Sequence, residues 1–223
     1  MTEQEKTLFT KNLLVWYQKE KRDLPWRKTT DAYAIWISEI MLQQTRVEAV
    51  LPYYERFLKA FPTLKDLAKA KEDLILKLWE GLGYYSRARN LQKCAQQLIK
   101  EGKTTLPKSE KELLQLPGIG EYTAAAIASI AHQEKTPAID GNVLRVMTRV
   151  LKDDSDITKQ ATKRKYKKML ADMMGEDPAS FTQALMEVGA LVCLPNGLPL
   201  CDSCPLQKLC ASYQDHTMLD YPV

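Results

Sequence analysis

The sequence predicts an all-α protein, and three observations lead to this fold class. Apolar residues recur at helical spacing along most of the chain, and the segments 13–17 and 35–41 each place them on one helical face. Signals for helix starts and stops recur, whereas no convincing alternation of apolar and polar residues marks a strand. Short loops with proline or glycine separate the predicted helices, which favours a fold made of packed helices.

The predicted elements follow in chain order. The first helix, around 13–17, is amphipathic and must cover an apolar surface elsewhere. A helix over 84–101 is expected to end at Gly102, because glycine accepts the left-handed conformation that closes a helix. The run 109–112 has the pattern of a capping box, and a helix rich in small residues covers 122–131. Asp140 is placed to cap the helix that follows it.

Composition excludes some classes of protein. The chain has 223 residues, 45% of them hydrophobic, which is enough for one large domain or two small ones. It has no apolar run of about 18 residues, so no membrane span is expected. The N-terminus is too polar for a secretory signal, so we expect a cytoplasmic protein. The net charge of +4 permits a nucleic-acid partner but is weak support for one.

Four of the five cysteines lie in one short stretch near the C-terminus, CLPNGLPLCDSCPLQKLC. In a reducing compartment, thiols clustered in this way indicate a metal centre more often than a disulfide. Four thiolates can bind zinc, but zinc sites usually use two close pairs, and only Cys201 and Cys204 are so spaced. The remaining cysteine, Cys94, falls on a predicted helix and is expected to be a small buried apolar residue.

The segment Leu116-Pro117-Gly118-Ile119-Gly120 separates two helical patterns. Its two glycines allow a tight turn that exposes backbone N–H groups at a helix N-terminus, where a phosphate oxygen is well placed. An ordinary turn between two helices would have the same sequence. Asp140 follows about twenty residues later, and this layout resembles that of the helix-hairpin-helix DNA glycosylases. The resemblance implies that Gly118 and Gly120 grip DNA phosphates, commonly with a bound monovalent cation, and that Asp140 faces the sugar of an extruded nucleotide.

The residue two positions after the last hairpin glycine separates mechanisms within that superfamily. Enzymes similar to endonuclease III carry a lysine there, which attacks the sugar and then cleaves the strand. This sequence has Tyr122, and a phenol cannot form the Schiff base that an amine forms. The resemblance therefore implies a monofunctional glycosylase that uses water.

The run 36–45, WISEIMLQQT, closely resembles the most characteristic motif of the adenine DNA glycosylase family of MutY type. Glu39 sits in it among apolar residues, where desolvation is expected to raise its pKa and keep the carboxyl protonated for general-acid work. A lone glutamate is more often a surface residue of an amphipathic helix. The segments 24–27, 81–91 and 181–190 are also similar to this family, so the resemblance covers essentially the whole chain.

The resemblance implies a two-lobed all-α fold. Residues 31–133 are expected to form a six-helix lobe with the helix-hairpin-helix, and residues 1–30 with 134–223 a discontinuous lobe with a [4Fe-4S] cluster. The expected ligands of this cluster are Cys193, Cys201, Cys204 and Cys210. Seven residues separate the first two cysteines, one more than is usual in that family, and the loop is expected to absorb the extra residue as a bulge.

The implied substrate is adenine opposite 8-oxoguanine or guanine in double-stranded DNA, bound by a monomer. The target base must leave the stack, at a cost of roughly a few kcal/mol. Gln44 and Tyr84 match the positions that wedge into the duplex, Trp26 and Arg27 those that line the adenine pocket. Plain core packing remains an alternative for Trp26 and for Gln183, which is expected to read the base edge. The other residues expected to bind substrate or DNA are Leu42, Arg87 and Asn142.

Adenine is a poor leaving group as an anion, so Glu39 is expected to protonate its N7. Ionised Asp140 is then expected to stabilise the oxocarbenium character of the sugar or to form a transient covalent bond. Tyr122 is expected to hydrogen-bond within this carboxylate pair. Water completes the hydrolysis and leaves an abasic site.

Three other functions stay open at this point. One is a mismatch thymine or uracil glycosylase of the same superfamily, whose members generally lack Glu39 in this setting. The others are a non-catalytic DNA-binding module with a structural zinc and an inactive family member.

The adenine glycosylases normally continue into a C-terminal domain similar to Nudix hydrolases, which recognises 8-oxoguanine. This sequence ends at Val223, so we expect adenine excision with a poorer preference for 8-oxoguanine over guanine.

Overall fold

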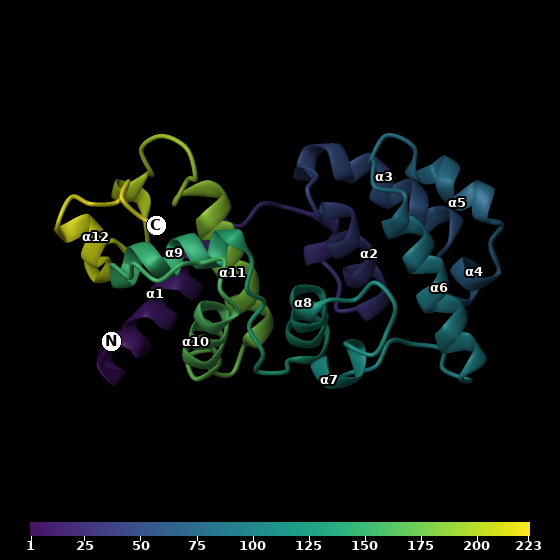
Figure 1. Cartoon of the computed structure of the whole chain (residues 1–223), viewed down its shortest axis with the longest axis horizontal. Helices are drawn as coiled ribbons and strands as arrows, with labels where there is room; N and C mark the ends of the chain where they lie inside the picture. The colour runs from purple at the N-terminus through teal and green to yellow at the C-terminus, as the bar shows by residue number, and fades with distance from the viewer. The chain divides into compact units, whose positions relative to one another are not determined.

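A computed structural model describes residues 1–223, and all of its regular elements are helical (Figure 1). The all-α prediction is confirmed. The chain divides into two compact units. Unit 1 comprises Met1–Arg22 and Gln133–Val223, and unit 2 comprises Asp23–His132. The sequence had suggested the divisions after residues 30 and 133. Each unit is described below by itself.

Unit 2 contains a short 3-10 helix and seven α-helices. In chain order they are η1 (Pro25–Arg27), α2 (Ala32–Leu42), α3 (Val47–Ala60), α4 (Leu64–Lys69), α5 (Glu72–Trp79), α6 (Ser86–Lys100), α7 (Glu110–Leu113) and α8 (Glu121–His132). Figure 1 shows α2 between α3 and α8, and it packs against both. Every residue of α2 from Ala32 to Met41 is buried, because the helix is apolar on all sides.

The ends of the unit 2 helices follow the signals in the sequence. Asp31 caps α2 by accepting from the backbone N–H groups of Tyr33 and Ala34 at 3.1 and 3.4 Å. Ser109 caps α7, which is a single turn. The helix predicted over 84–101 ends at Lys100, and Gly102 follows with a φ of 74°, as the left-handed closure requires.

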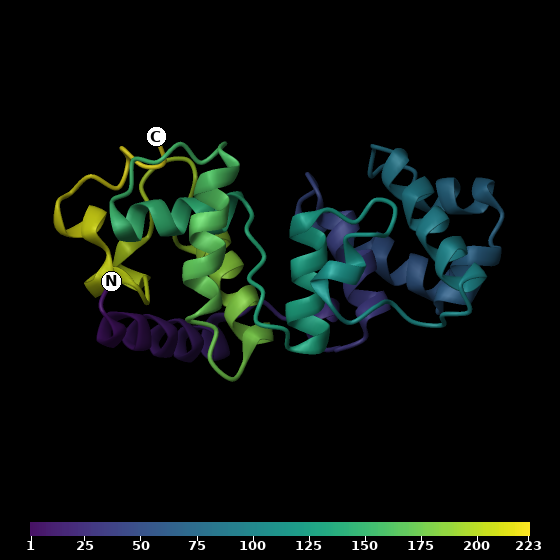
Figure 2. The same cartoon turned by 60° about the horizontal axis from the view of Figure 1, so that its bottom comes forward.

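Unit 1 is built around an apolar core to which its N-terminal and C-terminal segments both contribute. Its elements are α1 (Glu3–Glu20), α9 (Gly141–Leu151), α10 (Gln160–Ala171), α11 (Pro178–Leu191), η2 (Cys201–Ser203), η3 (Gln207–Leu209) and α12 (Ala211–Gln214). Phe9, Leu13 and Tyr17 of α1 are buried in this core, and α1 packs against α11 (Figure 2). No helix of either unit has the length and apolar content that crossing a membrane requires.

A buried ion pair fastens the end of the N-terminal segment to α11. Glu187 is 1% exposed, and Arg22 binds both of its carboxylate oxygens, with Nε at 3.0 Å and Nη2 at 2.7 Å. The backbone N–H of Arg22 adds a third hydrogen bond to the same carboxylate at 2.9 Å. Removing the Arg22 side chain would take two charge-assisted hydrogen bonds from a buried carboxylate, so the pair holds residues 1–22 on the C-terminal part of the chain.

Candidate active site and cysteine cavity

Glu39 lies in the middle of α2 and is only 6% exposed. A buried carboxyl needs a polar partner, and the hydroxyl of Tyr122 donates to its Oε2 at 2.8 Å. Tyr122 is in the first turn of α8, which packs against α2. The packing of these two helices therefore joins two residues that are far apart in the sequence, and it directs the phenol to the Glu39 carboxyl.

The predicted hairpin is a tight turn between α7 and α8. Gly118 has a φ of 75°, and a Cβ at this position would lie 2.6 Å from the Cβ of Asn90 on α6. Glycine is thus required here both by the backbone conformation and by the close approach of α6. Ile119 is 5% exposed and anchors the turn, whereas Gly120 has open space around it. The backbone between α7 and α8 is therefore fixed from inside unit 2.

The two predicted wedge residues both have left-handed backbone conformations. Gln44 follows the end of α2 with a φ of 58°, and Tyr84 precedes α6 with a φ of 47°. Both are exposed, Tyr84 to 64%. Such a φ is unusual for residues other than glycine and occurs often at functional sites. Leu42, the last residue of α2, is partly buried.

Three other predicted binding residues of unit 2 face its interior to different degrees. Trp26 is 6% exposed and packs edge-on against the ring of Tyr54, with 5.2 Å between the ring centroids. The contact fits core packing, and the expected place of Trp26 in an adenine pocket stays a prediction. Arg27, at the end of η1, is partly buried. Arg87 directs both terminal nitrogens of its guanidinium to backbone carbonyls of unit 2.

In unit 1, Asp140 caps α9, as predicted. Its Oδ1 accepts from the backbone N–H of Val143 at 2.8 Å, and its Oδ2 accepts from the side-chain amide of Asn142 at 2.8 Å. Arg145 in turn donates to Oδ1 of Asn142 at 2.8 Å. The amide is therefore held at both ends, which fixes the direction of the hydrogen bond that Asp140 receives.

Burial raises the pKa of Asp140 above its ordinary value. Four interactions act in the opposite direction: the hydrogen bonds from the backbone of Val143 and from both the side chain and the backbone of Asn142, and the positive charge of Arg145. When ionised, the carboxylate is a desolvated group supported by a few directed donors. Such a group can stabilise positive charge that develops beside it, because little water screens the interaction.

Gln183, expected to read a base edge, lies on α11 and has both ends of its amide bonded within unit 1. Its Oε1 accepts from the hydroxyl of Tyr17 at 3.2 Å, and its Nε2 donates to the carbonyl of Ala179 at 3.3 Å. These contacts join α1 to α11.

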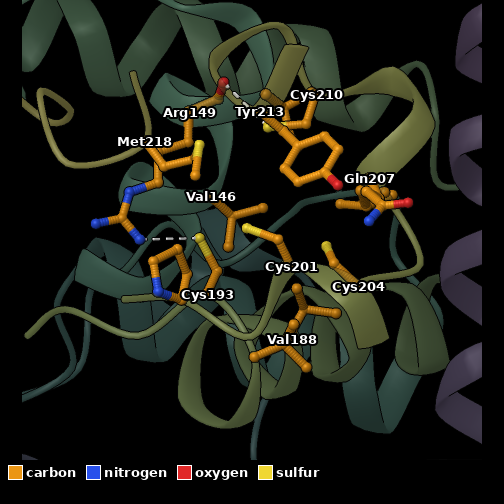
Figure 3. A pocket seen from close by; sticks show the side chains of 14 residues that line it. Val146, Arg149, Val188, Cys193, Cys201, Cys204, Gln207, Cys210, Tyr213 and Met218 are labelled. Atoms are coloured by element: carbon orange, nitrogen blue, oxygen red, sulfur yellow. Dashed lines mark hydrogen bonds between the residues drawn. The ribbon is translucent and has the colours of Figure 1, made fainter. Parts of the chain in front are cut away.

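The four clustered cysteines line one cavity of unit 1, whose other walls are largely apolar (Figure 3). None of them forms a disulfide. Burial raises the pKa of the Cys204 thiol to about 12 and also raises the pKa values of Cys201 and Cys210. Without a metal these thiols keep their protons, so binding of a metal centre would have to release them.

The cavity has one cationic side chain, that of Arg149 on α9. Its Nη1 donates to Sγ of Cys193 at 3.3 Å (Figure 3). The same nitrogen donates to the carbonyl of Leu194 at 2.8 Å. No three histidine, cysteine or acidic side chains lie close enough to hold a single metal ion. The four cysteines place sulfur donors around a shared space, a donor set that suits iron–sulfur chemistry.

The loop from Cys193 to Cys201 is exposed over residues 195–198. The backbone N–H of Leu200 bonds to the carbonyl of Val192 at 2.8 Å and closes the loop at its base. Gly197 reverses the chain with a φ of 73°, and Leu198 beside it is 72% exposed. The cysteines at both ends of the loop therefore stay at the cavity.

The sequence did not identify Arg145 and Arg149 as site residues. Arg145 links the α9 N-terminus to the cysteine segment, because its Nε donates to the carbonyl of Cys193 at 2.8 Å. Gly189 was also missed. A Cβ at this position would lie 2.5 Å from the Cβ of Asn142. The signal for the arginines was present, since two charges four residues apart in an otherwise apolar helix point to a specific role inside the fold.

Curated proteins similar to this chain are adenine DNA glycosylases. The protein from Rattus norvegicus is 46% identical over 218 residues, which is 93% of this chain and 42% of the rat protein. The protein from Homo sapiens is 44% identical over 220 residues, 94% of this chain and 40% of the human protein. The chain thus spans less than half the length of these two relatives.

Solved structures with the same fold include two kinds of DNA repair enzyme. A thermostable thymine-DNA glycosylase matches with a TM-score of 0.85 at 28% identity, over 95% of this chain and 98% of that chain. Endonuclease III in a non-covalent DNA complex matches with a TM-score of 0.78 at 23% identity, over 97% of this chain and 98% of that chain, and this shows the fold alone. The family described as HhH-GPD superfamily base excision DNA repair protein matches residues 37–172, more than half of the chain. The chain belongs to the HhH-GPD superfamily of base excision DNA repair proteins.

Proposed function

We propose that this chain is a monofunctional adenine DNA glycosylase. It hydrolyses the N-glycosidic bond of adenine paired with 8-oxoguanine or guanine in double-stranded DNA and leaves an abasic site. The observation that carries the proposal is the buried Glu39 with the Tyr122 hydroxyl 2.8 Å from its carboxylate. The activity named for the curated relatives supports the same substrate.

Glu39 is the general acid in this proposal. Adenine leaves as a neutral base once N7 carries a proton, and a carboxyl in an apolar setting is suited to supply it. Tyr122 orients this carboxyl through its hydrogen bond. A pyrimidine offers no N7, which makes Glu39 the residue that favours adenine over thymine or uracil.

Asp140 stabilises the positive charge that develops on the sugar, or forms a transient covalent bond with it. Its burial, together with the directed donors Val143 and Asn142, supports this role. Glu39 belongs to unit 2 and Asp140 to unit 1, and the proposal gives each a separate role. Water completes the reaction, because no lysine stands at position 122 to form a Schiff base.

The proposed partner is duplex DNA, bound by a monomer. The turn at Gly118 and Gly120 grips the phosphates through exposed backbone N–H groups, with a monovalent cation bound at the turn. Gln44 and Tyr84 enter the space that the adenine vacates, and their exposure supports this role. An aromatic ring that replaces a lost stacking partner is worth about 1–3 kcal/mol.

We propose further that Cys193, Cys201, Cys204 and Cys210 hold a [4Fe-4S] cluster. Four reduced thiols line one cavity, and cysteine thiolates are the ligands that hold this cofactor in proteins. When bound, the cluster supplies a cross-link within a tail of short helices and loops. The Arg149 guanidinium would face the thiolate of Cys193. The hydrolysis itself is assigned to side chains alone.

Replacing Cys204 by serine is expected to remove the cluster, because serine is a poor ligand for iron in such a site. The measurement is the visible absorbance of the purified chain together with its iron and sulfide content. Cys94→Ala is the matched control, since Cys94 is buried in unit 2 and should leave both values unchanged. A colourless wild-type chain with one zinc ion would contradict the cofactor assignment.

The activity is tested with four duplexes that differ in one pair: A:8-oxoguanine, A:G, T:G and U:G. We expect excision of adenine from the first two, and strand breaks only after alkali treatment, which cleaves at an abasic site. Excision of thymine or uracil in place of adenine would overturn the proposal in favour of a mismatch pyrimidine glycosylase. Breaks without alkali would contradict the monofunctional mechanism.

A further inference from the structure

One guanidinium of unit 2, that of Arg87 on α6, binds two separate segments of backbone. Nη1 donates to three carbonyls at the end of α2, those of Ile40 at 2.8 Å, Met41 at 3.2 Å and Gln43 at 2.6 Å. Nη2 donates to the carbonyls of Leu82 at 2.9 Å and Gly83 at 3.3 Å, in the loop before α6. The planar fork of an arginine presents two terminal nitrogens to two such segments, whereas the single nitrogen of a lysine cannot occupy both of these positions.

Two of these carbonyls lie directly before the predicted wedge residues. The peptide of Gln43 directly precedes Gln44, and the peptide of Gly83 directly precedes Tyr84. Both following residues have left-handed backbone, with φ values of 58° and 47°. A backbone of this kind persists only where its surroundings hold it in place. Arg87 thus holds, from inside unit 2, the peptide before each of the two exposed wedge side chains.

The ring of Tyr84 is held as well as its backbone. The guanidinium carbon of Arg87 lies 5.5 Å from the ring centroid of Tyr84 and 5.5 Å from that of Trp79. The indole N–H of Trp79 adds a hydrogen bond to the carbonyl of Gly83 at 3.0 Å. The exposed ring of Tyr84 is therefore supported by the Arg87 guanidinium, which itself contacts the buried indole of Trp79.

We propose that Arg87 is a positioning residue that fixes the separation of Gln44 and Tyr84, so that the two side chains enter the duplex as one rigid pair. The proposal deepens the function proposed above and rests on it. The resemblance had suggested that Arg87 binds DNA directly. In the structure, its Nη1 and Nη2 already serve five carbonyls, and its Nε is buried without a partner. Its effect on DNA is therefore exerted through the two loops.

A fixed pair of side chains reduces the free energy needed to extrude the adenine from the duplex. Two side chains on independent loops would each lose conformational entropy when they enter the DNA. In an anchored pair, this entropy is already lost in the free protein. The anchor should matter for extruding a stacked adenine and should matter little for an adenine that is already outside the stack. This difference separates positioning from a general loss of folded protein.

The test compares Arg87→Lys with Arg89→Lys. Lysine keeps the charge at position 87 but cannot bridge both loops. Arg89 is two residues further along α6 and makes only a surface ion pair with Glu72. The first readout is the ratio of excision rates for adenine in an A:G duplex and adenine in a single-base bulge, because the fraction of active protein cancels in this ratio. The second is hydrogen exchange of the amides in 40–47 and 82–88.

For Arg87→Lys we expect the duplex-to-bulge ratio to fall about 10-fold, as for the loss of a charged hydrogen bond. Exchange should rise in both segments, and Arg89→Lys should match the wild type in both readouts. An unchanged ratio, or faster exchange in one segment only, would overturn the proposal. If the wild type excises no adenine, the proposed function fails, and the exchange measurement still decides whether Arg87 joins the two loops.

A second experiment covers the case in which Arg87→Lys does not fold. Gln44→Ala and Tyr84→Ala leave the anchor in place and are measured singly and together on the A:G duplex. A rigid pair predicts that the double variant loses much less activity than the product of the two single losses. Independent effects that multiply would contradict a rigid pair.

Discussion

Replacing Glu39 by glutamine is expected to lower the single-turnover rate of adenine excision by about 10²–10⁴-fold, the usual contribution of a general acid. Glutamine has nearly the same shape and can still accept the hydrogen bond of Tyr122, so α2 and α8 should stay packed. It has no proton to give to N7, and adenine would then have to leave as an anion. The measurement is the excision rate on an A:G duplex with enzyme in excess.

Two controls connect this loss to the proton. Glu48→Gln changes an exposed glutamate of α3 and should leave the rate unchanged. A duplex with 7-deazaadenine offers no N7, so the wild type and Glu39→Gln should excise it equally slowly. A variant that retained near-normal turnover on A:G would remove Glu39 from the mechanism. A variant that lost duplex binding to the same extent would indicate a structural role.

The sequence was sufficient for the parts of the fold that local physics determines. The apolar spacing over 35–41 predicted a helix, and α2 covers Ala32–Leu42. Ser109 and Asp140 were predicted as caps because a short polar side chain satisfies N–H groups in its own first turn. Gly102 was predicted as a stop for the same local reason. None of these features depends on a distant part of the chain.

The contacts that position the candidate site residues depend on distant parts of the chain and could not be predicted in this way. An arginine two residues into a helix is indistinguishable in sequence from a surface residue, so the carbonyls bound by Arg87 appear only once α2 and α6 are packed. Trp26 was expected to line a base pocket, and its ring contact with Tyr54, 28 residues away, could not be predicted from its own segment. Gly189 shows the same limitation, because only the approach of α11 to Asn142 explains why it has no side chain.

Replacing Asp140 by asparagine is expected to reduce excision by about 10²–10³-fold or more, the loss measured when one preorganised charge partner is removed from a transition state. Duplex binding should remain. Asp177→Asn is the matched control. Asp177 also caps a helix of unit 1, accepting from the N–H of Ser180 at 3.0 Å, and it has no proposed role in the chemistry. Near-normal turnover by Asp140→Asn, or an equal loss in Asp177→Asn, would contradict the role of Asp140.

The same substitution should not weaken the fold, and the direction follows from the pKa of Asp140. Burial raises this pKa, so the folded chain binds the proton more tightly than the unfolded chain does. Stability from this group is therefore fully present below the unfolded pKa of about 3.9 and is lost as pH rises through the folded pKa. Asparagine never ionises, and it caps a helix about as well as aspartate. At pH 7 the Tm of Asp140→Asn should equal or exceed that of the wild type, and a decrease of more than about 5 °C would show that the carboxylate supports the fold as well as the chemistry.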